Sequence, residues 1–290
     1  MKLGLKTMSK LGSYLRLIRP VNCLMMGIAV LVGALLAKPD LLSGSLTVLL
    51  FGFVTGFTLT AASMAINDYY DRVIDAINEP KRPIPSGLVK PKYALVFSFV
   101  LTVVGFYMAY LTNFGCLLAA VAAWMLFVVY TTVGKQSGLP GNFLVSACVA
   151  IPFIYGSVAL LNNVSLNVFL FALMAFLANT GREVTKGIVD VQGDGLRSVR
   201  TLAVRFGENY AAEVAAFFYV LAVVLSPVPV ILGLVSFWFI PVVAVTDFGL
   251  ILSSILLLRN HSRQNARMIK QIALIWFLFG LLAFVVGALG

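Results

Sequence analysis

Most acidic side chains of this 290-residue chain fall into two short segments. Residues 67–92 read NDYYDRVIDAINEPKRPIPSGLVKPK, and residues 182–209 read REVTKGIVDVQGDGLRSVRTLAVRFGEN. The two segments together hold eight of the eleven Asp and Glu residues. Acids gathered in two places, in a chain that is otherwise largely apolar, are typical of a binding or catalytic site.

Both segments space their polar residues by four. The first set is Asn67, Asp71 and Asp75, and the second set is Lys186, Asp190 and Asp194. Side chains four residues apart project from the same face of an α-helix. Each set follows an even-numbered apolar stretch, which places both sets at the same end of the protein and suggests a parallel internal repeat. We expect the two sets to point together into the mouth of a helical bundle.

The crowded carboxylates of these sets require a cation. Carboxylates about 6 Å apart repel each other by roughly 3 kcal/mol per pair at an effective dielectric constant near 20. Oxygen ligands favour hard ions such as Mg²⁺ or Ca²⁺, and Mg²⁺ takes one or two carboxylates together with phosphate oxygens of a substrate. We therefore predict a Mg²⁺ site for a phosphate-bearing ligand. The predicted metal ligands are Asn67, Asp68, Asp71, Asp75, Asp190 and Asp194.

Basic residues accompany both acidic sets. Cations beside a metal stabilise the charge that builds on a leaving diphosphate. The pattern therefore predicts ionisation of an allylic diphosphate, whose apolar tail lies between helices, followed by attack of an acceptor on the resulting cation. The candidate substrate contacts are Lys81, Arg82, Lys186 and Arg197, with Tyr130 as a further lining residue.

A structural role is the alternative for each acid taken alone. Asp or Glu near a helix end often caps the helix or pairs with a neighbouring Arg, and Arg72 beside Asp71 is such a candidate pair. Two matched sets on one face favour the binding site. An ion-coupled secondary transporter, the remote alternative, would place its acids near the bilayer midplane on interrupted helices. A membrane scaffold would require neither set.

The rest of the sequence predicts the framework that positions these residues. The chain is 61% hydrophobic and only 11% charged. An apolar stretch of about 17 to 25 residues crosses the roughly 30 Å of membrane hydrocarbon as a helix. Nine such stretches occur, at roughly 21–37, 46–66, 93–112, 115–133, 143–161, 165–181, 211–233, 235–258 and 269–289. We expect one all-α polytopic domain over residues 1–290, with residues 67–92 and 182–209 as loops.

The formal net charge of +10 lies almost entirely on one side of this predicted bundle. Lys and Arg gather in the N-terminal segment and after even-numbered stretches, and Lys38 is the exception. By the positive-inside rule, the N-terminus and both acidic segments are expected in the cytoplasm, and Gly290 outside the plasma membrane. Residues 1–18 predict an amphipathic helix in the cytoplasmic interface.

This placement of charge favours membrane lipids over nucleic acid as the partner of the basic face. The cysteines Cys23, Cys116 and Cys148 lie in predicted spans without metal-ligand spacing, and His261 is the sole histidine. Thiolate or imidazole metal chemistry is therefore not expected. The expected partners are an isoprenyl diphosphate, a lipid-phosphate acceptor and membrane lipids, with no obligate protein partner.

At the acidic sets the sequence resembles the UbiA superfamily of intramembrane prenyltransferases. Its N-x-x-x-D-x-x-x-D and D-x-x-x-D motifs are matched by Asn67, Asp71, Asp75, Asp190 and Asp194. The stretches NEPKRPIPSG and TLAVRFG that follow them are also similar. The resemblance implies nine helices around a lipid-open cavity, capped by two cytoplasmic loops, with Mg²⁺ between the aspartate motifs.

The resemblance also implies roles for individual residues. The catalytic aspartates are Asp71, Asp75, Asp190 and Asp194, with Asn67 beside them at the metal and diphosphate. Phosphate contacts fall to Lys81, Arg82 and Lys186, and Asn22 is expected to line the same site.

The acceptor is suggested by the stretch REVTKGIVDVQGD. It looks most like the archaeal digeranylgeranylglyceryl phosphate synthases, especially at Glu183 and Lys186. Those enzymes transfer geranylgeranyl from its diphosphate to the hydroxyl of geranylgeranylglyceryl phosphate, in archaeal ether-lipid synthesis. Because this acceptor is an alcohol, a proton must leave, and Glu183 is a candidate base. A chlorophyll-synthase-like or quinone-pathway enzyme with an aromatic acceptor is the alternative.

Overall fold

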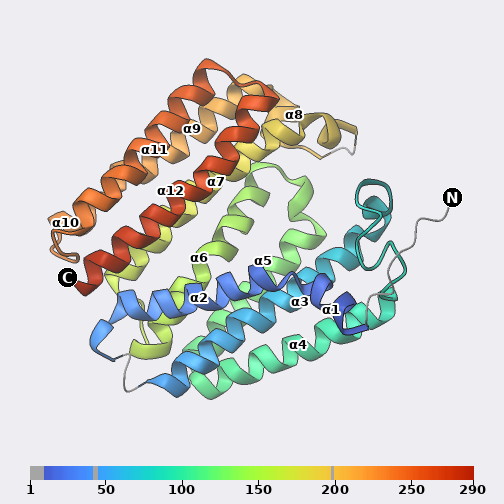
Figure 1. The fold of residues 1–290 in the computed structure, drawn as a ribbon, viewed down its shortest axis with the longest axis horizontal. Coiled ribbons are helices and arrows are strands. Elements are labelled where there is room, and N and C mark those ends of the chain that lie inside the picture. The colour runs from blue at the N-terminus through green and yellow to red at the C-terminus, as the bar shows by residue number, and fades with distance from the viewer. Residues whose placement is uncertain (1–9, 42–44, 197–198) are drawn as a thin grey trace.

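The computed structural model describes residues 10–41, 45–196 and 199–290, which are largely helical (Figure 1). The helices are α1 (Lys10–Ile18), α2 (Pro20–Ala37), η1 (Pro39–Leu41), α3 (Leu46–Asn78), α4 (Pro91–Thr112), α5 (Phe114–Thr132), η2 (Gly134–Gln136), α6 (Leu139–Leu161), α7 (Leu166–Leu196), α8 (Leu202–Phe206), α9 (Glu208–Leu225), α10 (Val228–Ile231), α11 (Phe239–Arg259) and α12 (Arg263–Leu289). Within these ranges, nine candidate spans are long and apolar enough to cross a membrane. The predicted all-α bundle is confirmed.

Local sequence explains where several helices begin. Pro20 and Pro91 lie in the first turns of α2 and α4, where the N–H that proline lacks would have no helical partner. Asn113 begins α5, because its side chain accepts a hydrogen bond from the Cys116 N–H at 2.7 Å. Such signals divide the apolar sequence into separate helices joined by short connections.

The two longest helices, α3 with 33 residues and α7 with 31, carry the two acidic sets. The predicted loops at 67–92 and 182–209 are therefore only partly correct. Residues 67–78 continue α3, and residues 182–196 continue α7. The physical reason is that no proline interrupts either extension, so the backbone hydrogen bonds of each span continue past its apolar part. The aspartates thus lie on helical extensions of α3 and α7.

Helices α2 and α6 approach each other closely through glycine. A Cβ on Gly33 would overlap the backbone of Phe153, and one on Gly156 would overlap the backbone of Val30 and Ala34. Small residues allow this kind of backbone approach between membrane helices, where van der Waals packing drives association. The contact joins the beginning of the chain to its middle.

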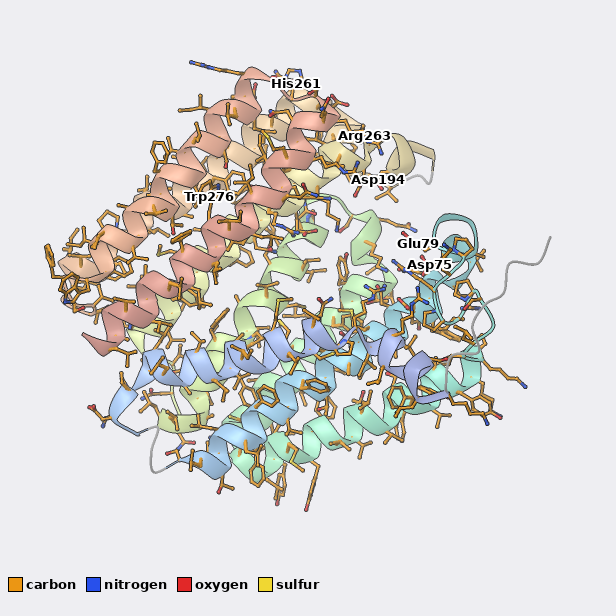
Figure 2. All side chains as sticks on the ribbon, viewed as in Figure 1. Asp75, Glu79, Asp194, His261, Arg263 and Trp276 are labelled. Atoms are coloured by element: carbon orange, nitrogen blue, oxygen red, sulfur yellow. The ribbon has the colours of Figure 1, made fainter. Side chains whose placement is uncertain are left out.

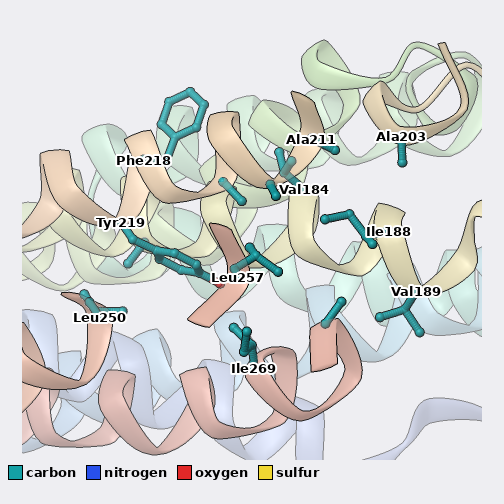
Figure 3. Packing of buried hydrophobic residues seen from close by; sticks show 14 of the residues in the cluster. Val184, Ile188, Val189, Ala203, Ala211, Phe218, Tyr219, Leu250, Leu257 and Ile269 are labelled. Atoms are coloured by element: carbon teal, nitrogen blue, oxygen red, sulfur yellow. The ribbon is translucent and has the colours of Figure 1, made fainter. Parts of the chain in front are cut away.

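Helices α7, α9, α11 and α12 share a second packed core (Figure 3). Ile188, Tyr219, Leu257 and Ile269 are at most 1% exposed there. At the edge of this core, Arg263 Nε of α12 donates a hydrogen bond to the Val189 carbonyl of α7 at 2.9 Å. These contacts hold the extension of α7 that carries the second acidic set.

The short helix α1 packs against α3 near the first acidic set. Leu17 and Ile18 are buried, whereas Leu11 is 71% exposed and Leu15 is also exposed. The predicted N-terminal helix is therefore confirmed for residues 10–18, and residues 1–9 lie outside the described part of the chain. Its place in a membrane interface stays a prediction.

Candidate active site

Two residues of the first acidic set, Asn67 and Asp71, bind the side chain of Lys135. Asn67 Nδ2 donates a hydrogen bond to Asp71 Oδ2 at 3.0 Å, as expected for residues four apart on one helix face. Lys135 Nζ, from η2, donates to Asn67 Oδ1 at 2.6 Å and to Asp71 Oδ1 and Oδ2 at 3.0 and 2.7 Å. Three oxygen atoms of one α3 face therefore converge on a single cation.

The other two acids of α3 are paired with arginines. Arg82 lies 2.5 Å from Asp75 and 3.6 Å from Asp68, and Arg19 lies 2.6 Å from Asp68. Asp68 is 1% exposed and Asp75 is 5% exposed, so each carboxylate needs a cationic partner. Asp68, expected from the sequence as a metal ligand, here holds two arginines. We assign it to positioning those cations.

The second acidic set lies on the extension of α7. Glu183 Oε1 accepts a hydrogen bond from Arg182 at 3.0 Å, and its Oε2 accepts one from Lys186 at 3.1 Å. Lys186 also interacts electrostatically with Asp190, one turn further along. Figure 2 shows Asp75 and Asp194 at the same end of the molecule, near the ends of two different helices. This confirms the expected placement of both sets at one end.

Tyr130 of α5 relates the two sets to each other. It interacts electrostatically with Asp71 of the first set, and with Glu183 and Lys186 of the second. Lys135 Nζ also lies 6.0 Å from the centre of the Tyr130 ring. Tyr130 is therefore near residues of both acidic sets.

A backbone contact reinforces this link. The N–H of Arg200, in the segment that follows α7, donates to the Gln136 carbonyl of η2 at 3.2 Å. Gly138 has a φ of 73°, and the Arg200 carbonyl oxygen leaves no space for a Cβ there. The segment that carries Lys135 is therefore tied to the connection beyond the second acidic set.

The remaining predicted residues are distributed more widely. Asn22 is half-buried in the first turn of α2, and Lys81 is exposed beside Arg82. Arg72 is not the partner of Asp71: it donates to the Tyr69 carbonyl at 2.7 Å and lies 4.4 Å from the centre of the Tyr69 ring. The predicted contact Arg197 lies outside the described residues.

Sequence reasoning missed three cations of this site: Lys135, Arg19 and Arg182. Lys135 is the only charged residue between positions 133 and 138, so an isolated lysine at the end of an apolar stretch was the available signal. Arg19 directly precedes Pro20, the first residue of α2, and its φ of 52° is unusual for a residue other than glycine. Its ion pair with Asp68 ties the beginning of α2 to α3.

The site thus combines oxygen ligands with an excess of nearby cations at the end of an apolar bundle. Among the described residues, no three His, Cys, Asp or Glu side chains converge on one metal position. Instead, the aspartates come from two separate helices, each beside lysine or arginine. Such an arrangement suits an anionic ligand that contributes oxygen atoms of its own.

Comparison with known proteins gives consistent matches. A family model described as the UbiA prenyltransferase family matches residues 26–281. The digeranylgeranylglyceryl phosphate synthase of Methanosarcina mazei is 36% identical over 287 residues, covering 95% of this chain and 98% of the relative. The protein of that name from Archaeoglobus fulgidus is 36% identical over 292 residues, covering 97% and 98%.

Solved structures agree with these matches. One, described as giving structural and mechanistic insights into digeranylgeranylglyceryl phosphate synthase in membranes, has a TM-score of 0.86 at 33% identity and covers 97% of this chain and 99% of its own. A UbiA homologue from Archaeoglobus fulgidus bound to GPP and Mg²⁺ has a TM-score of 0.66 at 17% identity, covering 94% and 99%. The latter shows a shared fold.

Proposed function

Because this chain belongs to the UbiA prenyltransferase family, we propose that it transfers a geranylgeranyl group from geranylgeranyl diphosphate to the hydroxyl of geranylgeranylglyceryl phosphate. The product, digeranylgeranylglyceryl phosphate, is an intermediate of archaeal ether lipids. The observation that carries the proposal is the Lys135 segment: Lys135 bonds Asn67 and Asp71 of the first set, and neighbouring Gln136 bonds Arg200, in the connection beyond the second set. Both acidic sets can thereby act on one ligand. The relatives that match nearly the whole chain support the choice of acceptor.

Mg²⁺ fits the donors of this site. Asn67 Oδ1 and both carboxylate oxygens of Asp71 already converge on the ammonium of Lys135, so this face of α3 binds a cation through oxygen atoms. When bound, Mg²⁺ would neutralise the diphosphate and favour its departure. The residues proposed to hold it are Asn67, Asp71, Asp75, Asp190 and Asp194.

The cations around the first set are proposed to hold the leaving diphosphate. Lys135 and Arg82 each lie against a carboxylate of α3, at 2.7 Å and 2.5 Å, and each is partly exposed. Arg82 has further N–H groups for diphosphate oxygens, whereas the three N–H groups of Lys135 face Asn67 and Asp71, so Lys135 contributes its positive charge beside the diphosphate. Arg19, anchored by Asp68, adds positive charge beside Arg82. Charge that develops as the allylic C–O bond breaks is thereby stabilised.

The second set is proposed to receive the acceptor. Lys186 is the more exposed cation of the Arg182–Glu183–Lys186 group, and it suits the acceptor phosphate. The acceptor hydroxyl oxygen forms the new ether bond to the allylic carbon and loses its proton. Glu183, held at 3.0 and 3.1 Å from two cations, is the candidate to accept that proton. Asn22 and Lys81 are proposed to contact substrate at the edge of the site.

The protein is a multi-pass membrane protein, and we propose the plasma membrane as its location. The basic residues lie mainly at the end of the bundle that carries the acidic sets. By the positive-inside rule this end faces the cytoplasm, together with the N-terminus, and the C-terminus lies outside. Both substrates then reach the site from the inner leaflet.

The test is a transfer assay with purified protein in detergent or vesicles. We expect Mg²⁺-dependent release of diphosphate from geranylgeranyl diphosphate when geranylgeranylglyceryl phosphate is supplied, with the double ether as product by mass spectrometry. Prenylation of a phenolic acceptor alone would overturn the assigned acceptor. Turnover that is indifferent to Mg²⁺ would overturn the metal site.

A further inference from the structure

A pocket lies at the end of the molecule away from the acidic sets. It is formed where the end of α2, the beginning of α7, the connection between α10 and α11 and the end of α12 meet. Figure 1 shows α10, the far end of α2 and the C-terminus at this end, away from the N-terminus. We call it the distal pocket, and its lining includes Leu36, Ser165, Asn167, Val235, Ser236 and Gly287.

Two polar side chains of the distal pocket carry buried atoms without partners. Asn167 is 8% exposed, and its Nδ2 donates to the Leu36 carbonyl at 3.4 Å. Its Oδ1 has no hydrogen-bond partner within the described residues, and the same holds for Ser236 Oγ. The Ser236 backbone is fixed by a hydrogen bond from its N–H to the Gly287 carbonyl at 2.8 Å. Buried polar atoms are almost always paired, so two in one pocket point to a missing partner.

The lining defines the chemistry of that partner. The described residues around the pocket include no Asp, Glu, Lys, Arg or His, so no charged side chain there compensates the phosphate of a charged lipid. An unpaired amide oxygen accepts a hydrogen bond, and a serine hydroxyl both donates and accepts. A ligand with neighbouring hydroxyl groups satisfies both atoms. The pocket volume of about 580 Å³ is far larger than one water molecule needs.

The rim of the pocket identifies the source of the ligand. Ile231, the last residue of α10, is 78% exposed, and Phe237 and Trp238, in the connection that borders the pocket, are 73% and 62% exposed. Large exposed apolar and aromatic residues at a helix end are typical of the boundary between membrane and water. A soluble polyol would gain nothing from these residues, whereas the chains of a lipid would cover them.

We propose that the distal pocket binds the uncharged glycerol head group of a membrane lipid. A head-group hydroxyl donates to Asn167 Oδ1, and a second one pairs with Ser236 Oγ. The lipid chains lie over Ile231, Phe237 and Trp238. This site is separate from the acidic sets, which lie at the other end of the bundle and carry charge.

The test uses a photoactivatable monoacylglycerol, whose glycerol head group keeps two neighbouring hydroxyls, in phosphatidylcholine vesicles that contain the full-length protein. Cross-linked peptides are mapped by mass spectrometry in the wild type and in Asn167→Leu, Ser236→Ala and Asn163→Leu. Asn163, four residues before Asn167, is exposed and outside the pocket lining, so it is the matched control. We expect labelling of segments 164–168 and 231–238, reduced at least about fivefold in the two pocket variants and unchanged in the control.

Two further arms identify the head group and its source. A photoactivatable lysophosphatidylcholine with the same chain should label these segments at least about fivefold less, because no charged side chain of the lining compensates its phosphate. Unlabelled monoacylglycerol should compete with the probe, and free glycerol should not. Equal labelling by lysophosphatidylcholine, equal competition by free glycerol, or unchanged labelling in a folded Asn167→Leu or Ser236→Ala protein would each overturn the proposal. Ser236→Ala removes only one hydroxyl, which keeps the test valid if Asn167→Leu does not fold.

Discussion

Lys135 Nζ lies 2.7 Å from Asp71 Oδ2, across a sequence separation of 64 residues. The lysine comes from the turn between α5 and α6, and the aspartate from the extension of α3. Because Lys135 also bonds Asn67, one ammonium group holds the Asn67 and Asp71 side chains together on one face of α3. It also lies 6.0 Å from the centre of the Tyr130 ring, and Tyr130 is within electrostatic range of Glu183 and Lys186 of the second set.

Replacing Lys135 by Met should therefore impair catalysis much more than folding. Loss of one stabilising cation at developing charge typically lowers rates by about 10²–10³-fold, and we expect a fall of that size in kcat/KM for geranylgeranyl diphosphate. The matched control is Lys92→Met, which removes an exposed lysine near the beginning of α4. Steady-state kinetics on both variants decides the matter: activity of the Lys135 variant within twofold of wild type would contradict its proposed role beside the diphosphate.

Asp71→Asn and Asp190→Asn should each reduce turnover about 10³-fold or more while the protein stays folded. Each substitution keeps the shape of the side chain and removes the charge that binds a divalent cation. Asp40→Asn is the control, since Asp40 is an exposed acid in η1. Turnover measured over a Mg²⁺ titration, alongside thermal unfolding, separates metal binding from stability. Wild-type turnover in both motif variants would show that the acids are structural.

Chelation of divalent ions should stop turnover without unfolding the protein. In the described structure Asp71 is paired with Lys135, and Asp75 with Arg82, so neither carboxylate depends on a metal for charge compensation. We expect EDTA to abolish diphosphate release, with a melting temperature within about 2 °C of the untreated protein, and Mg²⁺ to restore activity. A large loss of stability in EDTA would mean that the metal is part of the fold.

The Arg19–Asp68 ion pair should contribute to stability. Arg19→Ala leaves Asp68, which is 1% exposed, with Arg82 at 3.6 Å as its remaining ion-pair partner. An under-compensated buried carboxylate costs about 1–3 kcal/mol, so the free energy of unfolding should fall by that amount. Adding Asp68→Asn should recover part of the loss, because the buried group is then neutral. Purely additive effects in this double-mutant cycle would show that the pair is not coupled.

Gly138 offers a test of the backbone contact between Gln136 and Arg200, which ties the segment of Lys135 to the connection beyond the second acidic set. Gly138→Ala would place a Cβ on a residue with a positive φ and against the Arg200 carbonyl. Gly87 also has a positive φ, 77°, but no described atom lies within 4 Å of its Cβ position. The control, Gly87→Ala, therefore measures backbone strain alone, about 1 kcal/mol. We expect Gly138→Ala to lose more stability and also at least tenfold in activity, since Lys135 is displaced. Equal effects of the two substitutions would show that the contact between Gln136 and Arg200 does not hold Lys135 in place.

The sequence predicts the helices and the faces of the motifs well, because both follow from local periodicity. Asn67 and Asp71 contact each other since four residues make about one helical turn. Adjacency in the sequence was a poorer guide to ion pairs, because Arg72, next to Asp71, bonds the Tyr69 carbonyl instead. Partners such as Lys135 and Arg19 depend on how distant helices pack, which no local pattern encodes. The distal pocket had no sequence signal, since Asn167 and Ser236 are ordinary polar residues far apart in the chain.

The unbroken course of α3 from its apolar part to Asp75 has a consequence for insertions and deletions. One added residue within this helix turns everything beyond it by about 100°, which would point Asp71 away from Lys135 and Tyr130. Seven added residues, about two full turns, would restore the direction but shift the carboxylate by about 10 Å along the axis. The length of this helix is therefore constrained as strictly as its motif residues. By contrast, the connection from 79 to 90 can vary in length wherever Arg82 still reaches Asp75.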